Sequence, residues 1–317
     1  MPLHPVIKHV AAKVARATTP RSDIPAVWRS QALTVDREVT RSYMKPAPDC
    51  FVRDVEILCA NKAPLRIRLY SPRHQRPAGA LLHFFGGAFR QGGVDYPSTD
   101  ITNRTRAARS GILVAAVDYA LSPESRFPEP IDQGLAALEW LASNSATLGF
   151  PAGNVAIGGL SAGGNIAAGV ALAARNYPIP NLLFQLLEVP VLDLTGEHFL
   201  GEVAVGLGQN WHSIKHDLIE MGLLYLRGAN PTDPHASPLL APQVGGLPPT
   251  HVFTAEYDVF RGDGSAFVDR LRASGIPAQE YRYAGMTHDS HFYDLALPQA
   301  RAWRRDVERL LYTQFRS

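Results

Sequence analysis

Cysteine is nearly missing from this chain of 317 residues, which has only Cys50 and Cys59. Two cysteines cannot form a disulfide framework or a four-thiolate zinc cluster. Two buried or half-buried free thiols are therefore expected, and a single disulfide between them is the alternative. No apolar run reaches the roughly 20 residues that a membrane-spanning helix needs. Lysine and arginine interrupt the apolar residues of the N-terminal stretch, which argues against a secretory signal. The sequence therefore predicts no membrane span and a cytoplasmic location.

The chain also lacks an excess of positive or negative charge. The chain has 31 Lys and Arg against 29 Asp and Glu, a formal net charge of +2. A surface that follows nucleic-acid phosphates is strongly basic, so nucleic acid is not an expected partner. With 46% hydrophobic residues, the chain predicts either one large α/β domain with an attachment or two domains.

Nearly continuous apolar runs of strand length recur along the chain, as strands buried on both faces require. They cover residues 79–85, 111–119, 154–160, 181–190 and 250–258. Stretches of helical length follow most of them, at residues 98–110, 131–148, 162–176 and 264–274. This alternation predicts an α/β fold with a mostly parallel central sheet flanked by helices. Two alternating segments ahead of it, 51–58 and 64–72, predict an antiparallel pair.

Two stretches, residues 1–48 and 194–228, do not fit this alternation. The second contains the helical pattern WHSIKHDLIEMGLLYLRG. We expect both to form a helical cap over one edge of the sheet, which divides the α/β core into residues 49–193 and 229–317.

Apolar residues at helical spacing mark both ends of the chain. In the first segment they are Val6, Val10 and Val14, and in the last helix they are Trp303, Val307, Leu310 and Leu311. We expect both stripes to pack against the domain. His212 and His216 stand four residues apart in the inserted helix, but no third ligand accompanies them, so no metal site is expected.

The strongest chemical signal is the pentapeptide Gly159-Leu160-Ser161-Ala162-Gly163, placed directly between a predicted strand and a predicted helix. In such a turn a serine is held on a strained bend, and small neighbours let the chain fold back closely. The positive end of the following helix would face developing negative charge. The alternative is a glycine-rich turn without chemistry.

A serine nucleophile needs a base, and the base needs a partner that fixes its tautomer. Asp258 stands at the end of one late strand, and His288 follows the short strand-like segment AQEYRYA, so both can reach the rim that holds Ser161. The competing residues are Glu256, Asp263 and Asp289 as the acid and His291 as the base.

A third feature is the small-residue turn Gly86-Gly87-Ala88, after the first buried strand. Its backbone N–H groups could face an oxyanion together with the N–H of Ala162. The alternative is a plain strand-to-helix glycine loop.

These motifs resemble the hormone-sensitive-lipase group of the α/β-hydrolase superfamily, which contains bacterial carboxylesterases. GLSAGGNIAAGVAL is similar to its GDSAGGNLA elbow, and FGGAFRQGGVD falls on its HGGGF stretch. VDYALSPESRFPEPIDQGLAALEWL, TAEYDVFRGDGSAFVDRLRASGIP and YAGMTHDSHFY match three further segments in order. The resemblance implies Ser161 as nucleophile, Asp258 as acid, His288 as base, and the N–H groups of Gly87, Ala88 and Ala162 as an oxyanion hole.

The chain departs from the family pattern around the turn. Phe85 stands where the family has the first histidine of HGGG, Ala88 replaces its third glycine, and Leu160 replaces an aspartate. Ala120 replaces an arginine, and Asp289-Ser290 replaces Gly-Phe. A histidine can tether the loop by hydrogen bonds, whereas phenylalanine can only pack. We expect His83, two residues before Phe85, to substitute partially for that tether.

The sequence thus predicts a serine hydrolase without metal or cofactor that cleaves esters of short to medium acyl chains. The cap supplies Trp28, Trp211 and several Leu and Phe residues, which is enough apolar surface to line a pocket for such an acyl group, but the sequence does not predict which of them line it. Two alternatives stay open: a biosynthetic acyltransferase, lactonase or cyclase that uses the same triad, and a binding protein for a small ligand. A homodimer is left open as well.

Overall fold

The computed structural model describes residues 3–10, 24–179 and 181–317, which are built on an eight-stranded sheet. The strands are β1 (Phe51–Leu58), β2 (Pro64–Ser71), β3 (Ala80–Phe84), β4 (Leu113–Val117), β5 (Val155–Leu160), β6 (Gln185–Glu188), β7 (Thr250–Tyr257) and β8 (Ala278–Thr287). They lie in the order β1-β2-β4-β3-β5-β6-β7-β8. The predicted antiparallel pair is β1 and β2, and every neighbouring pair from β4 to β8 is parallel. The predicted α/β fold class is confirmed.

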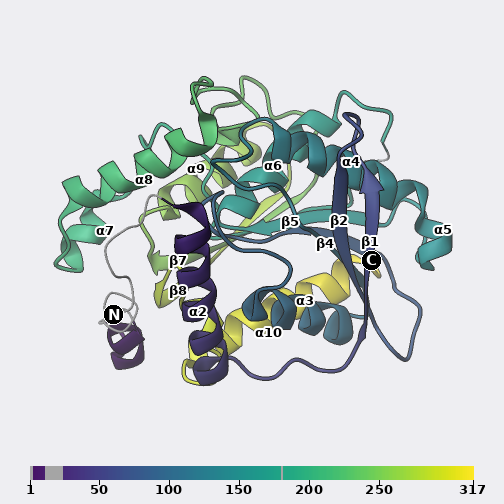
Figure 1. Cartoon of the computed structure of the whole chain (residues 1–317), viewed down its shortest axis with the longest axis horizontal. Coiled ribbons are helices and arrows are strands. Elements are labelled where there is room, and N and C mark those ends of the chain that lie inside the picture. Colours follow the sequence, from purple (N-terminus) through teal and green to yellow (C-terminus); the bar gives the residue numbers. More distant parts are fainter. Residues whose placement is uncertain (1–2, 11–23, 180) are drawn as a thin grey trace.

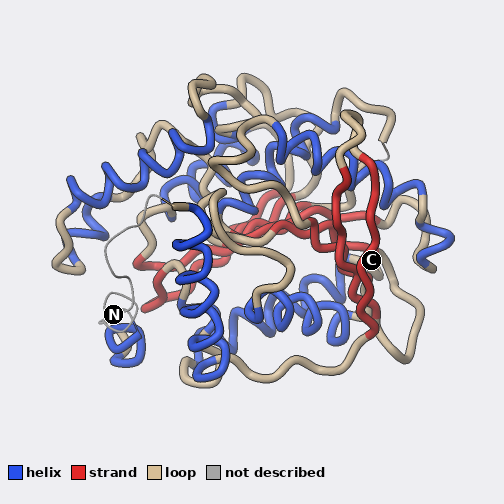
Figure 2. The backbone as a smooth tube through the Cα atoms, viewed as in Figure 1, coloured by secondary structure: helices blue, strands red, loops and turns tan. Residues whose placement is uncertain are grey.

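Helices cover both faces of this sheet (Figures 1 and 2). Those described are α2 (Pro25–Tyr43), α3 (Pro97–Ser110), α4 (Glu129–Ser143), α5 (Ser145–Leu148), α6 (Ala162–Ala174), α7 (Gly201–Gly206), α8 (Trp211–Leu226), η1 (Pro238–Leu240), α9 (Arg261–Ala273), η2 (Ser290–Phe292) and α10 (Pro298–Gln314). In Figure 1, α4, α6 and α9 lie above the sheet, and α3 and α10 lie below it.

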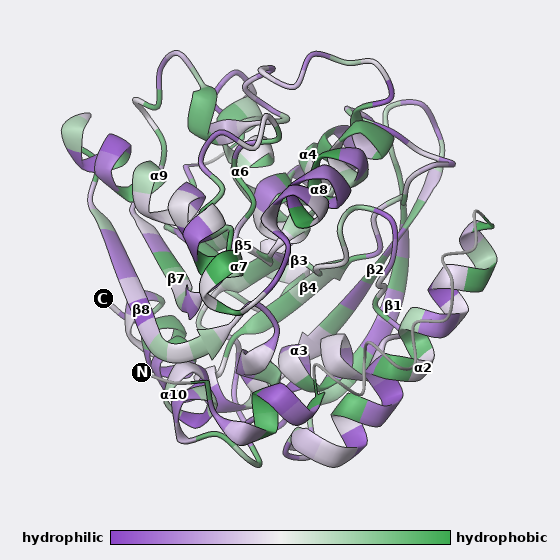
Figure 3. Ribbon diagram, turned by 90° about the vertical axis from the view of Figure 1, so that its left-hand side faces the viewer, coloured by the Kyte–Doolittle hydropathy of each residue, from purple (hydrophilic) through white to green (hydrophobic). Residues whose placement is uncertain are grey.

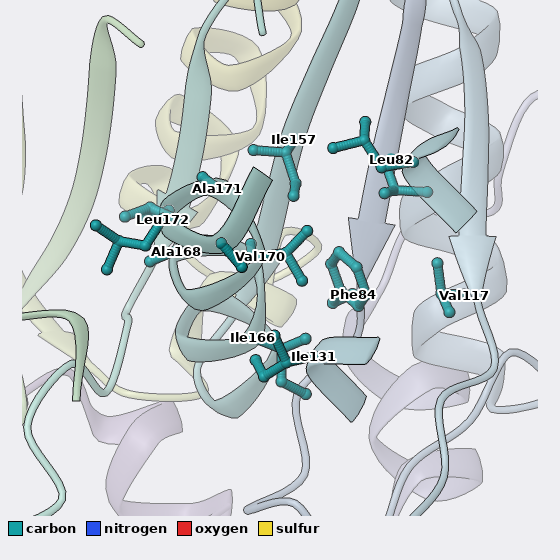
Figure 4. Close-up of a cluster of buried hydrophobic side chains, with 14 of the residues drawn as sticks. Leu82, Phe84, Val117, Ile131, Ile157, Ile166, Ala168, Val170, Ala171 and Leu172 are labelled. Atoms are coloured by element: carbon teal, nitrogen blue, oxygen red, sulfur yellow. The ribbon is translucent and has the colours of Figure 1, made fainter. Parts of the chain in front are cut away.

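The central strands are buried on both faces, as their continuous apolar runs predict. On β3, Leu82 and Phe84 pack against the α4 and α6 layer, where Ile131 and Val170 lie near the Phe84 ring (Figure 4). Leu81, on the opposite face, belongs to the cluster that contains residues of α10. Figure 3 shows the central strands as hydrophobic and much of edge strand β8 as hydrophilic. The pleat thus gives the sheet two separate core layers.

Several predicted boundaries differ from the structure, three of them in ways that matter for the elements around the site. The stretch 131–148 forms two helices, because the Asn144 amide donates to the Trp140 carbonyl at 2.8 Å and ends α4 there. Strand β6 pairs over only four residues, where a run of ten was expected. Strand β8 is longer than its predicted segment and ends at Thr287, so His288 directly follows it.

Both ends of the chain pack on the sheet. Helix α10 buries Trp303, Val307, Leu310 and Leu311, as predicted. Residues 5–10 are helical, and Ile7 and Val10 are buried in the same core layer, whereas Val14 lies outside the described residues. The two cysteines are buried free thiols, as expected. Among the described residues, no helix combines the length and apolar character needed to cross a membrane.

The segments predicted to form the cap contribute α2, α7 and α8. Helix α2 packs against α3, while α7 and α8 lie on the α4 and α6 side of the sheet (Figures 1 and 3). Residues of both segments line the same cavity as Ser161, which directly follows β5, so both lie near the carboxyl end of a central parallel strand, where ligands bind in open α/β sheets.

Candidate active site

Ser161 lies on a sharp turn between β5 and α6. Its φ of 54° and ψ of −118° place it in a region that L-residues rarely adopt. A Cβ on Gly159 would stand 2.1 Å from the carbonyl oxygen of Gly163, and one on Gly163 would stand 2.2 Å from that of Phe84. Gly159 and Gly163, the two glycines of the G-x-S-x-G motif, therefore cannot be replaced by a larger residue, because neighbouring backbone atoms approach them closely.

Two hydrogen bonds join Ser161, His288 and Asp258. Nε2 of His288 lies 2.8 Å from Oγ of Ser161, and its Nδ1 lies 2.8 Å from Oδ2 of Asp258. A carboxylate only accepts, so Nδ1 carries a proton and leaves Nε2 of the neutral ring to accept from the serine hydroxyl. The Asp258 side chain is 2% exposed, and its other oxygen accepts the N–H of Phe260 at 3.0 Å. The structure thus brings together the three residues that the sequence predicts.

The surroundings of His288 favour its charged form. Burial acts to lower the pKa of the ring, but the charge of Asp258 and its hydrogen bond outweigh burial and raise the pKa to about 9. The Phe260 ring covers the imidazole edge-on at 5.2 Å between centroids. An imidazolium formed at this position is therefore stabilised by Asp258.

Two of the competing acids bind backbone. Oε2 of Glu256 accepts the N–H of Gly285 at 2.6 Å, which ties β7 to β8. Oδ2 of Asp263 accepts the N–H groups of Leu192 and Asp193 at 2.7 and 3.0 Å. Burial raises the pKa of Asp263 well above its ordinary value. Asp263 thus binds the backbone that follows β6 and does not contact His288.

The remaining competitors lie next to His288. Asp289 is exposed and borders the cavity described below. Nδ1 of His291 lies 3.0 Å from the carbonyl oxygen of His288, and the His291 ring stacks on Trp303 at 5.4 Å. Burial lowers the pKa of His291 to about 4. His291 therefore supports the backbone of the base instead of contacting Ser161.

The glycine turn after β3 lies against the serine. A Cβ on Gly86 would stand 3.4 Å from Cβ of Ser161, and one on Gly87 would stand 1.9 Å from the Gln91 carbonyl oxygen. Gly87 has φ 142° and Ala88 has φ 51°, both in the region that favours glycine. Ala88 adopts that conformation in spite of its side chain, so the turn carries strain.

Three backbone N–H groups border the serine without a protein acceptor. Those of Gly87 and Ala88 lie in the turn, and that of Ala162 opens α6. Within the described ranges, none of the three donates to another group of the chain. They are available to an oxygen atom of a bound molecule.

A large cavity of about 1140 Å³ opens above Ser161, and its lining includes His288 and the glycine turn. Cap segments supply much of the rest. From α2 these are Trp28, Gln31, Ala32, Val35, Asp36 and Val39; from residues 194–228 they are Leu194, Phe199, Asp217, Leu218, Glu220, Met221, Gly222 and Leu224. Of the two cap tryptophans, Trp28 borders this cavity. Trp211, at the start of α8, has its ring against Gly201 at the start of α7.

The family model described as α/β-hydrolase fold matches residues 81–292. The chain belongs to the α/β-hydrolase family. The carboxylesterase NlhH of Mycobacterium tuberculosis is 34% identical over 244 residues, which are 74% of this chain and 73% of that protein. The arylesterase of Saccharolobus solfataricus is 33% identical over 71% of this chain and 72% of its own length.

Solved structures of the family agree over nearly the whole chain. A hyperthermophilic esterase from the archaeon Pyrobaculum calidifontis superposes with a TM-score of 0.87 at 30% identity, covering 99% of both chains. The thermostable carboxylesterase EstE1, cloned from a metagenomic library, gives a TM-score of 0.82 at 31% identity over 92% of this chain and 98% of its own. The predicted resemblance to hormone-sensitive-lipase-like carboxylesterases is confirmed.

In this α/β-hydrolase, Tyr119 holds the glycine turn, a role that our sequence reasoning missed. Its hydroxyl donates to the Phe85 carbonyl at 2.8 Å, and its ring stacks on the Phe85 ring at 4.2 Å. Phe85 thus packs as expected. His83 does not tether the turn, because its Nε2 accepts from Arg106 at 2.7 Å on the other face of the sheet. Position 119 lies in the VDY stretch, which was a signal that could have identified it.

A buried ion pair under the serine was also missed. The Arg106 guanidinium of α3 donates to the Glu188 carboxylate at the end of β6, and their side chains are 6% and 2% exposed. Nε1 of Trp303 donates to the other carboxylate oxygen at 2.8 Å. The Glu188 carbonyl accepts the N–H of Ser161 at 2.8 Å, so this network supports the turn that holds Ser161. Glu188, a charged residue inside the apolar run NLLFQLLEVP, was the feature of the sequence that could have indicated a buried ion pair.

The described residues hold no cluster of three or more His, Cys, Asp or Glu side chains suited to a metal ion. His212 and His216 are exposed on α8.

Proposed function

We propose that this α/β-hydrolase cleaves carboxylic esters of short to medium acyl chains through an acyl-enzyme on Ser161. The chain is a carboxylic ester hydrolase, in line with relatives named carboxylesterase and arylesterase. The observation that carries the mechanism is the unbroken hydrogen-bond chain from Asp258 through His288 to Ser161, beside three unused N–H groups.

In the first half of the reaction, Nε2 of His288 takes the proton of Ser161 as the serine oxygen attacks the ester carbonyl carbon. Asp258 stabilises the imidazolium that forms. His288 then gives the proton to the leaving alcohol oxygen, and the acyl group stays on the serine. In the second half, His288 activates a water molecule that releases the acid and restores Ser161.

The N–H groups of Gly87, Ala88 and Ala162 would donate hydrogen bonds to the oxyanion of each tetrahedral intermediate. Loss of one such donor typically costs about 10²- to 10³-fold in rate. The turn is already bent in the free protein, so little reorganisation is needed when charge develops.

The cavity supports esters with small or medium apolar groups. Its lining between α2 and α8 is rich in apolar side chains such as Trp28, Val35, Leu218 and Met221. We infer that residues 1–48 and 194–228 act as the cap of a core formed by residues 49–193 and 229–317. A homodimer and a cytoplasmic location stay predictions.

Hydrolysis of p-nitrophenyl acetate and butyrate tests the reaction, and fluorophosphonate labelling tests the nucleophile. We expect the wild-type chain to hydrolyse both esters and to take one label. Ser161→Ala should do neither while keeping its circular dichroism spectrum. A Ser161→Ala variant with more than a few percent of wild-type turnover would refute the nucleophile. Labelling without hydrolysis would favour the triad-bearing acyltransferase, lactonase or cyclase, and failure of both assays would favour the ligand-binding protein.

A further inference from the structure

Arg29 of α2 donates hydrogen bonds to two loops of the α/β core. Its Nε donates to the Arg90 carbonyl at 2.9 Å, and its Nη2 donates to the Ser122 carbonyl at 2.8 Å. Both terminal nitrogens also reach the Glu124 carboxylate, at 2.9 and 2.6 Å. A guanidinium presents its donors in a rigid planar fork, so this one side chain joins two backbone segments at fixed positions.

The first carbonyl that Arg29 binds ends the glycine turn. The Arg90 N–H donates to the Gly87 carbonyl at 3.1 Å and closes the turn on itself. Ala88 and Phe89, which lie between them, have φ values of 51° and 60°. Residues in this region keep their conformation only where surrounding contacts fix it. Arg29 provides such a contact at the Arg90 end.

The second carbonyl belongs to the segment that supports the turn from outside. The N–H of Ser122 donates to the Phe89 carbonyl at 2.8 Å, and the Phe89 ring stacks on Tyr225 at 4.0 Å. Arg29 therefore binds both the turn and the segment that is hydrogen-bonded to it. A shift of either segment would stretch one of the two bonds to the guanidinium.

Helix α2 has anchors that do not involve Arg29. Oδ2 of Asp36 accepts the N–H of Ser98 at the start of α3, at 3.1 Å. The carbonyl of Tyr43 accepts the N–H of Leu295, beyond η2, at 2.9 Å. Removal of the Arg29 head group therefore leaves α2 docked along most of its length and loosens mainly its contact with the turn.

We propose that Arg29 is a positioning residue of the oxyanion hole, which keeps the turn of Gly87 and Ala88 in the conformation that presents its N–H groups to the substrate oxygen. The inference rests on the proposed ester hydrolysis at Ser161. It gives α2 a second role besides lining the cavity, since a cap helix also sets the geometry of the catalytic turn.

Kinetics of Arg29→Met, Arg29→Lys and Glu124→Gln on p-nitrophenyl butyrate test this role. Arg29→Met keeps an apolar stem and loses both carbonyl contacts. We expect it to lower kcat by about 10- to 100-fold, less than outright loss of a hole donor, and to change KM by less than about threefold. Arg29→Lys has a single ammonium group that cannot span both carbonyls, so its kcat should be intermediate.

Glu124→Gln is the matched control. It removes the charge from an exposed ion pair and leaves both carbonyl contacts of Arg29 in place. We expect its kcat to stay within about twofold of wild type, because exposed pairs contribute little. Melting temperatures identify any variant that fails to fold, and Arg29→Lys carries the test if Arg29→Met does not fold.

Wild-type kcat in folded Arg29→Met and Arg29→Lys would overturn the proposal. An equal loss of kcat in Glu124→Gln, or a loss that lies wholly in KM, would overturn it as well. Failure of the proposed hydrolase function can be distinguished from failure of the Arg29 proposal. In that case the wild-type chain would be inactive, or Ser161→Ala would remain active, independently of the residue at position 29.

Discussion

Replacement of Arg106 by methionine should strongly destabilise the fold. Methionine fills similar space but leaves the Glu188 carboxylate, 2% exposed, with the Trp303 N–H as its remaining side-chain donor. Loss of one partner of a buried ion pair typically costs about 3–5 kcal/mol, because an uncompensated charge stays buried. At about 2 °C for each kcal/mol in a chain of this size, the melting temperature should fall by roughly 6–10 °C.

Two further variants separate charge burial from loss of packing. In Arg106→Met combined with Glu188→Gln, the amide oxygen can still accept from Trp303 and no charge is buried, so most of the lost stability should return. Arg309→Met breaks an exposed pair with Asp306, whose side chains are 75% and 32% exposed, and should cost less than about 1 kcal/mol.

Thermal unfolding followed by circular dichroism measures all three variants. An Arg106→Met variant that melts within 2 °C of wild type would refute the reasoning. So would a double variant no more stable than Arg106→Met, because the penalty would then come from packing and not from the buried carboxylate.

Two further changes probe the catalytic residues. In the proposed mechanism His288 accepts a proton and must be neutral, and its pKa is raised to about 9, so wild-type kcat/KM should increase with pH up to about 9. Asp258→Asn removes the charge that raises the pKa of His288, so the rise of kcat/KM with pH should occur at lower pH than in wild type. Turnover should also fall by roughly 10⁴-fold. A rise of kcat/KM at the same pH as in wild type would contradict the assignment of Asp258. Tyr119→Phe removes the donor that holds the Phe85 carbonyl, so the glycine turn should be less well positioned and kcat on p-nitrophenyl butyrate should fall about tenfold; the unpaired carbonyl should also cost about 1–3 kcal/mol of stability. The exposed Tyr312→Phe serves as its control, and equal kcat in both variants would exclude a role for the hydroxyl.

The positions of Ser161 and Asp258 could be predicted because each directly follows a strand that its own apolar run identifies, and His288 follows the short strand-like segment AQEYRYA. Parallel strands bring their carboxyl ends to one edge, so order along the chain was enough to place these residues on a common rim. The glycine turn was predictable for the same reason, since it follows β3.

Contacts between distant segments were beyond such reasoning. Arg106 and Glu188 lie on different elements and meet only after the sheet and α3 have packed, and nothing local pairs them. The error on His83 has a simple cause. Residues 83 and 85 would share a face on a continuous strand, but β3 ends at Phe84, and Phe85 enters the opposite core layer beside Tyr119.

The distribution of the proposed catalytic groups over the sheet has a consequence for folding. Ser161 follows β5, Asp258 follows β7, His288 follows β8, and the turn with Gly87 follows β3. Esterase turnover therefore requires four strands to be aligned at once, including contacts between residues far apart in the chain. Such contacts form slowly compared with helices. In a refolding experiment, recovery of hydrolysis would thus report completion of the sheet, at a time when far-ultraviolet signals from helices have already returned.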